Sequence, residues 1–207
     1  MCEVPDQTFV FGAGGHAKVI LEILEAEGKQ IGGVFDQNVS LGAVWDYPVS
    51  AFPGDFDKTS DELIIAVGQN RSRQMLAESL AVTTYGTVIH PSAVISPRAQ
   101  IGDGTVLMAG VTINADAVIG AHCIVNTGAQ IDHDCVIGDF AHVSPGTTLC
   151  GNVHIGVGSH FGAGAVAIPG MHVGNWAIVG AGAVVVRNVP DGVTVVGTPA
   201  RPLPQPS

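Results

Sequence analysis

The sequence is poor in aromatic and basic residues. Aromatic residues make up only 5% of the 207 residues although 46% are hydrophobic, so the core must be built from Val, Ile and Ala rather than from rings. Eight Lys and Arg stand against eighteen Asp and Glu, which gives a formal net charge of −10. This balance argues against a nucleic-acid partner, and any anionic ligand would be held by backbone N–H groups with one or two local charges.

Long apolar runs are missing too, and cysteine is scarce. No stretch approaches the roughly 20 consecutive apolar residues of a membrane span, and residues 1–6 lack the basic start and apolar run of a signal peptide. We therefore expect a cytoplasmic protein without a membrane span. Cys123 and Cys135 are expected to be buried as small hydrophobic residues, while Cys2 and Cys150 lack metal-ligand spacing. Disulfides are not expected.

The second half of the chain repeats with a period of six residues. From Ile89 to Val185 every sixth residue is apolar. A second column, four residues further on in each repeat, holds small or slim side chains from Ala93 to Ala183, and Met171 is its one large member. Two interlocked columns predict a solenoid of short parallel strands. Because side chains alternate along a strand, both columns should face inward and the residue between them outward.

The residue that follows the large column is often Gly or Asn. Such residues tolerate positive φ, so we expect these positions to form the corners of the solenoid with that conformation. They are Gly102, Asn114, Gly120, Asn126, Gly138, Gly156, Gly162, Gly174 and Gly180.

Before the repeat, the chain has the pattern of a small α/β unit. Short apolar strands are predicted at residues 8–11, 31–36 and 63–67, and amphipathic helices at residues 18–27 and 71–80. This is half of a dinucleotide-binding type of fold, in which ligands sit at the carboxyl ends of the parallel strands.

The turn after the first strand is rich in glycine. Gly12, Gly14 and Ala17 match the dinucleotide fingerprint G-x-G-x-x-A, but a lone match is weak evidence. The half-sized unit and the pair Gly15-His16 make NAD doubtful.

Charged residues near the other strand ends allow two interpretations. Asp36 ends the second strand and either accepts hydrogen bonds from a ligand or caps the strand. Arg71 and Arg73 open the second helix, where they lie either near a bound phosphate or on a solvated helix surface.

The hexads and the ending Gly197–Arg201, which reads G-T-P-A-R, resemble the left-handed parallel β-helix of hexapeptide acyltransferases, a known exception to right-handed crossovers. The resemblance implies three faces, 18 residues per coil and between five and six coils. We therefore expect a small, half-Rossmann-like α/β domain at residues 1–85, a left-handed β-helix at 88–188 and a C-terminal tail at 189–207.

A coil of 18 residues turns sequence spacing into contacts. His142 should stack on His160 and His133 on Gly151, with Asn126 one coil away from His142. His133 and His142 are nine residues apart, or half a coil, so within one chain they point to different sides of the prism. A site that uses both must be completed by a neighbouring subunit. For His142 and His160, packing at a trimer interface is the simpler alternative.

A closer resemblance lies in the segment 130–139, which contains Ile-Asp-His-Asp. Together with the turns at 12–17 and 66–70 and with Asp36, it resembles hexapeptide acetyltransferases that acetylate the 4-amino group of nucleotide-linked amino sugars. Members act on UDP-linked bacillosamine precursors or GDP-perosamine, and the family includes sialic-acid O-acetyltransferases. The resemblance covers nearly the whole chain. It implies an acetyl-CoA-dependent N-acetyltransferase for a UDP- or GDP-linked 4-amino-4,6-dideoxy sugar, without a metal, as a homotrimer with active sites between subunits.

Residue roles follow from the same resemblance. His133 matches the general base, and Asp134 matches the acid that orients its imidazole, where relatives often have Glu. Gly151 matches a backbone N–H that binds the carbonyl oxygen. The implied acetyl-CoA-binding residues are Asn126, His142, Gly151, Gly162, Ala163, Gly180 and Ala181. The implied residues for the nucleotide-linked sugar are Gly12, Gly14, Gly15, His16, Asp36, Gly68 and Asn70.

Three alternatives stay open. The first is O-acetylation of sialic acid or another sugar hydroxyl, and the second is a catalytically silent β-helix scaffold or binding protein, which the intact His133-Asp134 pair disfavours. The third is a zinc site like that of γ-type carbonic anhydrases, built from His142, His160 and a neighbouring subunit's His133. The sequence chooses neither UDP nor GDP and does not name the sugar.

Overall fold

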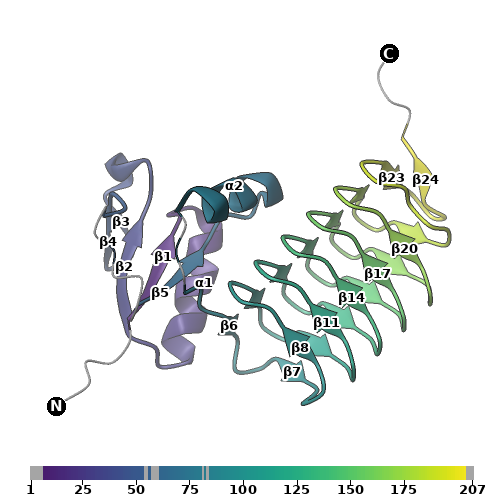
Figure 1. Cartoon of the computed structure of the whole chain (residues 1–207), viewed down its shortest axis with the longest axis horizontal. Coiled ribbons are helices and arrows are strands. Elements are labelled where there is room, and N and C mark those ends of the chain that lie inside the picture. Colours follow the sequence, from purple (N-terminus) through teal and green to yellow (C-terminus); the bar gives the residue numbers. More distant parts are fainter. Residues whose placement is uncertain (1–6, 54–55, 57–60, 81, 83, 204–207) are drawn as a thin grey trace.

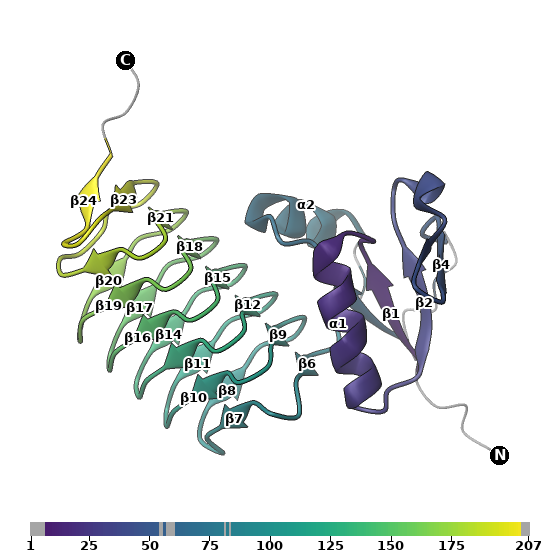
Figure 2. The ribbon, with the colours of Figure 1, turned by 180° about the vertical axis from the view of Figure 1, so that it is seen from behind.

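The computed structural model of the chain describes residues 7–53, 56, 61–80, 82 and 84–203. Cys2 lies outside these residues. Within them, no helix is both long and apolar enough to cross a membrane. Figure 1 shows a small α/β unit beside the first coils of a long parallel β-helix, and Figure 2 shows that the later coils extend away from this unit.

The α/β unit is built on a five-stranded sheet with the strand order β3-β4-β2-β1-β5. The central strand β1 (Thr8–Phe11) pairs in parallel with β2 (Ile31–Phe35) and with β5 (Glu62–Ile65). On its other side, β2 pairs in parallel with β4 (Tyr47–Ser50), which pairs antiparallel with β3 (Ala43–Val44). The three strands expected from the sequence are present, whereas β3 and β4 carried no clear apolar pattern.

Two helices and a short 3-10 turn complete the unit. The 3-10 turn covers Val39–Leu41, α1 covers Gly15–Ala26 and α2 covers Asn70–Leu80. The apolar side of α1 is fully buried, with Ile20 and Leu24 at 0% exposure. It packs in one cluster with the outward-facing residues Val88, Val106 and Ile124 of the first β-helix coils. The α/β unit and the β-helix therefore share a hydrophobic core.

Strands β6 to β22 have two residues each and alternate among three sheets. The six-stranded face contains β7 (Val94–Ile95), β10 (Thr112–Ile113), β13 (Gln130–Ile131), β16 (Thr148–Leu149), β19 (Val166–Ala167) and β22 (Val184–Val185). The five-stranded face contains β8 (Gln100–Ile101), β11 (Val118–Ile119), β14 (Val136–Ile137), β17 (His154–Ile155) and β20 (His172–Val173). The eight-stranded face contains β6 (Val88–Ile89), β9 (Val106–Leu107), β12 (Ile124–Val125), β15 (His142–Val143), β18 (His160–Phe161), β21 (Ile178–Val179), β23 (Thr194–Val196) and β24 (Arg201–Pro202).

Each coil has the expected 18 residues, because paired strands are displaced by that number, as His142 is paired with His160. β23 pairs with β21, so the eight-stranded face continues into the segment expected to be a separate tail. The two sequence columns form one continuous core: Val143 and Phe161 of the large column and Ala141 and Ala165 of the slim column all have 0% exposure.

The expected positive φ directly after the large column is wrong. Positive φ occurs two residues later, where the described coils have Gly or a polar or aromatic residue. At Gly138 and Gly156 the reason for glycine is space: an added Cβ would lie 2.7 Å from the backbone nitrogen of Val157 and 2.5 Å from that of Asn175. The backbone of the next coil therefore approaches too closely for any side chain.

We predict that Gly156→Ala destabilises the protein more than Gly164→Ala. The first variant forces a methyl group into the backbone of the next coil, a form of overpacking that costs roughly 3 kcal/mol. At Gly164, φ is 65° and no atom lies within 4 Å of an added Cβ, so only backbone strain of about 1 kcal/mol applies. Urea unfolding measures both free energies, and equal losses would contradict this explanation.

Candidate active site

His133 and Asp134 lie at the edge between the six-stranded and five-stranded faces, in the turn from β13 to β14. The Nδ1 atom of His133 is 2.7 Å from Oδ2 of Asp134. Asp134 has a φ of 58°, a conformation that Asp adopts more readily than most residues. The His133 ring lies over Gly151, since an added Cβ there would be 2.6 Å from Cε1. The structure therefore brings the three residues expected to be catalytic into one corner.

The carboxylates around His133 stabilise its protonated form. Hydrogen bonding to Asp134 and the nearby charge of Asp132 raise the pKa of His133 above its usual 6.5, although the ring is exposed. Asp132 itself accepts hydrogen bonds from Asn114 Nδ2 at 2.9 Å and from the His133 N–H at 2.8 Å. These bonds, and a weaker one from the N–H of Gly151, lower the pKa of Asp132. With Nδ1 engaged, Nε2 of His133 is the nitrogen free to exchange a proton.

His142 lies on the eight-stranded face, across the prism from the edge that carries His133. Its Nε2 atom is 3.2 Å from Nδ2 of Asn126, and its ring packs edge-on against His160 with a centroid distance of 4.8 Å. Burial, with smaller effects of His160, Arg73 and His16, lowers the pKa of His142 to about 3. The His142 ring is therefore neutral at physiological pH, whereas the carboxylates around His133 favour the protonated form of that ring.

His16 approaches the same place from the N-terminal end of α1. Burial and the charge of Arg73 lower the pKa of His16 to about 4, and a proton on the His16 ring would disfavour a proton on His142. The backbone of Gly68 also interacts with His142. Nε2 of His16 and Nδ1 of His142 are buried, and within the described residues neither has a hydrogen-bond partner. Residues expected to bind the sugar and the acetyl group thus meet in one chain.

The Gly-rich turn is held by Asp36. Its carboxylate accepts hydrogen bonds from the N–H of Ala13 and from the N–H of Asn38, both at 2.8 Å. This favours the structural interpretation of Asp36. Gly12 has a φ of 113° and an added Cβ would lie 2.8 Å from the oxygen of Ala66, whereas Gly14 and Gly15 have open space around them.

A cavity of about 420 Å³ opens at the carboxyl ends of β1, β2 and β5. Gly12 and Asp36 line it, but the other expected sugar-binding residues do not. Phe11, Gln37, Val67, Ser72, Met75, Leu76 and Ser79 form the remaining wall. The four wall residues from α2 occupy one helix face, so helical periodicity was the sequence signal that could have identified them.

Asn70 and Arg73 are buried, with 8% and 1% exposure. The Nδ2 atom of Asn70 donates to the oxygens of Gly158 at 3.1 Å and Ser159 at 3.3 Å. Both earlier interpretations of Arg73 are therefore wrong: it lies on neither a solvated surface nor a free phosphate site. Its guanidinium donates its hydrogen bonds to acceptors inside the protein, including the oxygen of His122 at 2.8 Å.

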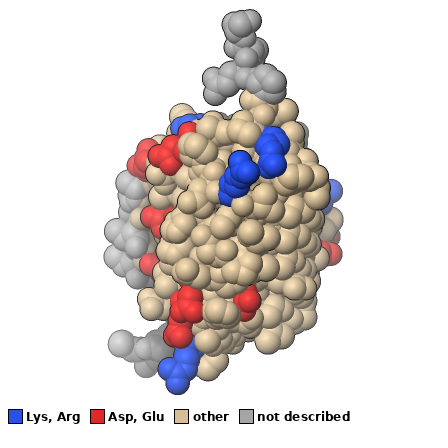
Figure 3. Space-filling view, turned by 90° about the vertical axis from the view of Figure 1, so that its right-hand side faces the viewer, with Lys and Arg blue, Asp and Glu red and all other residues tan. Residues whose placement is uncertain are grey.

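The four small residues expected near acetyl-CoA line the edge between the eight-stranded and six-stranded faces. A Cβ on Gly162 would lie 2.6 Å from the nitrogen of Ala181 and 2.7 Å from the carbonyl carbon of Gly180, so these coils are in close contact. Ala163 is exposed one residue further on. Seen from the end of the β-helix, the surface is almost free of charge apart from small groups of charged side chains (Figure 3).

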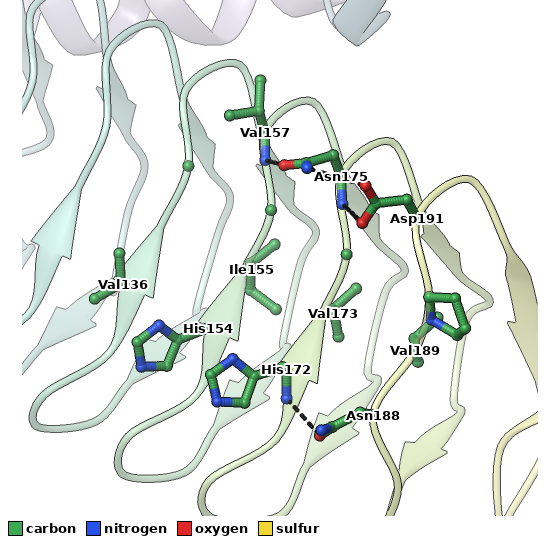
Figure 4. A pocket seen from close by; sticks show the side chains of 14 residues that line it. Val136, His154, Ile155, Val157, His172, Val173, Asn175, Asn188, Val189 and Asp191 are labelled. Atoms are coloured by element: carbon green, nitrogen blue, oxygen red, sulfur yellow. Dashed lines mark hydrogen bonds between the residues drawn. The ribbon is translucent and has the colours of Figure 1, made fainter.

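Another groove, of about 530 Å³, lies on the five-stranded face and contains none of the expected site residues. Figure 4 shows the rings of His154 and His172 side by side at its rim. Their centroids are 4.4 Å apart, and burial lowers the pKa of His154. In the part of the chain that the structure describes, no three His, Cys, Asp or Glu residues are grouped so as to hold a metal ion.

Comparison with known proteins connects this geometry to a family. Residues 7–80 match a family model described as the PglD N-terminal domain. PerB from Caulobacter crescentus, solved with CoA and GDP-perosamine, is 40% identical with a TM-score of 0.88, over 96% of this chain and 97% of that chain. The acetyltransferase domain of PglB from Neisseria gonorrhoeae FA1090, solved with acetyl coenzyme A, is 39% identical with a TM-score of 0.89, over 96% and 100% of the two chains.

The chain belongs to this family of acetyl-CoA-dependent sugar N-acetyltransferases. A curated relative, UDP-N-acetylbacillosamine N-acetyltransferase of Bacillus subtilis (strain 168), is 44% identical over 112 residues. That match spans 46% of this chain and 48% of the relative, about half of its length. The family and the fold expected from the sequence, a small α/β unit followed by a left-handed β-helix, are thus confirmed.

We predict that Asp134→Asn lowers the pKa of His133 toward 6.5. The hydrogen bond that the Asp134 carboxylate accepts from His133 Nδ1 is the largest cause of the raised value, and a neutral amide cannot stabilise the imidazolium in the same way. NMR titration of the His133 ring measures the change. Asp132→Asn, which removes a charge but no bond to the ring, is the control and should have the smaller effect. A His133 pKa that is the same in Asp134→Asn and the parent protein would contradict the prediction.

Proposed function

We propose that this protein transfers acetyl from acetyl-CoA to the 4-amino group of a UDP- or GDP-linked 4-amino-4,6-dideoxy sugar. The observation that most directly supports this proposal is the contact of 2.7 Å between His133 Nδ1 and Asp134 Oδ2, which leaves Nε2 of His133 available as a base. The relatives support the substrate class, since PerB was solved with CoA and GDP-perosamine and the curated relative acts on a UDP-linked sugar.

The reaction moves one proton from the amine to the sulfur in two transfers through His133, and it needs no covalent enzyme intermediate. The sugar amine attacks the thioester carbonyl carbon, a C–N bond forms, and the C–S bond breaks with CoA as the leaving thiol. His133 takes the proton that the amine loses and passes it to the departing sulfur, while Asp134 holds the ring in the required tautomer. General base catalysis of this type contributes roughly 10²- to 10⁴-fold to the rate. The raised pKa of His133 makes it a stronger base, active above that pKa.

Two further groups act on the acetyl end. The N–H of Gly151 would donate to the developing oxyanion, replacing its weak bond to Asp132. His142 is neutral because its pKa is about 3, and the amide of Asn126 donates to its Nε2, so Nδ1 carries the hydrogen. That buried N–H interacts with the backbone of Gly68 but makes no close hydrogen bond within the described residues, and it would hold the thioester.

The cofactor and the nucleotide have separate places in this proposal. Acetyl-CoA lies along the edge formed by Gly162, Ala163, Gly180 and Ala181, whose small residues allow close approach. After residue 98 the sequence contains only two Lys or Arg residues, Arg187 and Arg201. Backbone N–H groups therefore bind most of the phosphate oxygens of acetyl-CoA. The nucleotide of the sugar occupies the cavity of about 420 Å³ at the strand ends, beside the Gly-rich turn.

We further propose a homotrimer whose active sites are shared. His133 and His142 occupy an edge and the face across the prism from it, so one chain cannot direct both at the same thioester. A neighbouring subunit therefore supplies one of them.

The first test offers the purified protein acetyl-CoA with UDP- and GDP-linked 4-amino sugars, with CMP-sialic acid and with free sialic acid. Release of free thiol measures turnover, and we expect it only with an amino acceptor. Turnover only with hydroxyl acceptors would replace the proposal by O-acetylation. Lack of turnover with all of them would favour a scaffold or binding protein.

The second test examines sharing of the site. We predict that His133→Ala lowers kcat by at least about 100-fold, because the general base is lost. Acetyl-CoA affinity should change little. Co-expressed His133→Ala and His142→Ala chains, purified with two different tags, should regain part of the activity that either homo-oligomer lacks. Mixed oligomers as inactive as the two parents would contradict a shared site.

A further inference from the structure

The first residues of α2 contact four successive coils along one edge of the β-helix. This edge joins the five-stranded and eight-stranded faces and contains His122, Phe140, Gly158 and Trp176, which are spaced by 18 residues. Arg73 donates to the oxygens of His122 and Phe140, both at 2.8 Å. Asn70 donates to the oxygen of Gly158, and the guanidinium of Arg71 lies 4.1 Å from the centroid of a Trp176 ring.

The backbone along this edge has an unusual conformation at three of the four positions that α2 contacts. His122, Phe140 and Trp176 have φ of 52°, 59° and 55°, values that are unusual for bulky side chains. The rings of His122 and Phe140 stack at 5.0 Å, and Tyr85 packs against His122 at 4.4 Å. Ring stacking and docking of α2 together stabilise a conformation that would be costly in isolation.

Arg73 also holds the loop that follows β5. Its Nη1 donates to the oxygens of Val67 at 2.8 Å and Gly68 at 3.2 Å, and its Nη2 donates to Oδ1 of Asn70 at 3.0 Å. Val67 lines the cavity at the strand ends, and the backbone of Gly68 interacts with His142. One guanidinium thus connects the wall of that cavity, the surroundings of His142 and two coils of the β-helix.

The opposite side of α2 faces the cavity. Ser72, Met75, Leu76 and Ser79 of α2 form part of its wall. The orientation of this wall relative to the β-helix therefore depends on how the start of α2 is anchored. Among the described residues, Arg73 makes the largest set of these anchoring bonds, and it is 1% exposed.

We propose that Arg73 is a positioning residue that sets the nucleotide cavity in register with His142, so that a sugar extending from the bound nucleotide places its amine beside the acetyl group. This inference builds on the proposed function. The planar guanidinium presents five N–H donors in a fixed fork, which Lys cannot reproduce with its single ammonium. Arg73 touches no reacting atom in this arrangement and acts through α2 and the loop at residues 67–70.

The charge of Arg73 has a second consequence. It lowers the pKa values of His16, His142 and His160, in each case in addition to burial. His142 packs against His160 and interacts with His16, so the three rings lie in one region, and Arg73 is a positive group that acts on all of them. Burial is the larger cause for all three, and an Arg at this position, unlike a neutral side chain, adds to it and further disfavours protonation of these imidazoles.

The test compares Arg73→Lys and Arg73→Ala with Glu78→Gln, a control that neutralises an exposed charged side chain of α2. Assays run well below the midpoint of thermal unfolding of each variant. For Arg73→Lys we expect kcat to fall at least tenfold while the dissociation constant for UDP or GDP stays within twofold. The reason is that the cavity still binds the nucleotide but is no longer aligned with His142. Guanidinium ions should restore part of kcat in Arg73→Ala. Glu78→Gln should retain near-normal kcat.

A readout that needs no turnover separates this proposal from the proposed function. Binding of UDP or GDP should shift the NMR signals of the His142 ring in the parent protein, and this shift should be lost in Arg73→Lys. A folded Arg73→Lys with unchanged kcat and unchanged coupling would overturn the positioning role. Nucleotide affinity that falls in proportion to kcat would also overturn it, because Arg73 would then maintain the cavity itself. Lack of turnover by the parent protein with any acceptor would count against the proposed function alone.

Discussion

The structure depends on the hydrogen-bonded stacking of coils at intervals of 18 residues. Strand pairs such as His142 with His160 keep this interval along each face, and the neighbouring backbones leave no space for a Cβ at Gly138 or Gly156. Adjacent strands are about 4.8 Å apart, so outward side chains at the same position of successive coils lie next to one another. This regularity places the His133 ring over Gly151 and sets the amide of Asn126 beside His142.

The same scaffold gives two histidines opposite properties. His133 lies exposed at an edge between two carboxylates, and its pKa is raised. His142 lies under the α/β unit, where burial and neighbouring positive groups lower its pKa to about 3. One ring is thus suited to take up a proton and the other to remain a neutral hydrogen-bonding group. The nine-residue separation that directs them to different sides is half of the 18-residue coil.

Much of the fold was predictable because the apolar columns repeat without interruption, and an alternating pattern identifies buried faces. The pairing of His133 with Asp134 was predictable because the two are adjacent in sequence. The reason why glycine is required at the corners was not predictable, because the distance between neighbouring coils is a property of the tertiary structure. The surface position expected for Arg73 was wrong for a similar reason. Its acceptors at His122 and Phe140 lie 49 and 67 residues away in sequence, and no local pattern indicates them. For Asp36 the sequence left a ligand-binding and a structural role open, and the hydrogen bond that its carboxylate accepts from the Ala13 N–H, 23 residues away, shows the structural one.

The sequence by itself determined the period, the inward and outward faces and the residues that stack, since these follow from side-chain alternation and a constant repeat. It also contained the motifs that mark the family. The tertiary structure alone decided how the α/β unit docks. Burial of Val88, Val106 and Ile124 under α1, and the bonds of Arg73 across the β-helix edge, join segments with no shared period. That docking brings His16 and Gly68 to His142, because the environment of a side chain depends on all the segments that surround it.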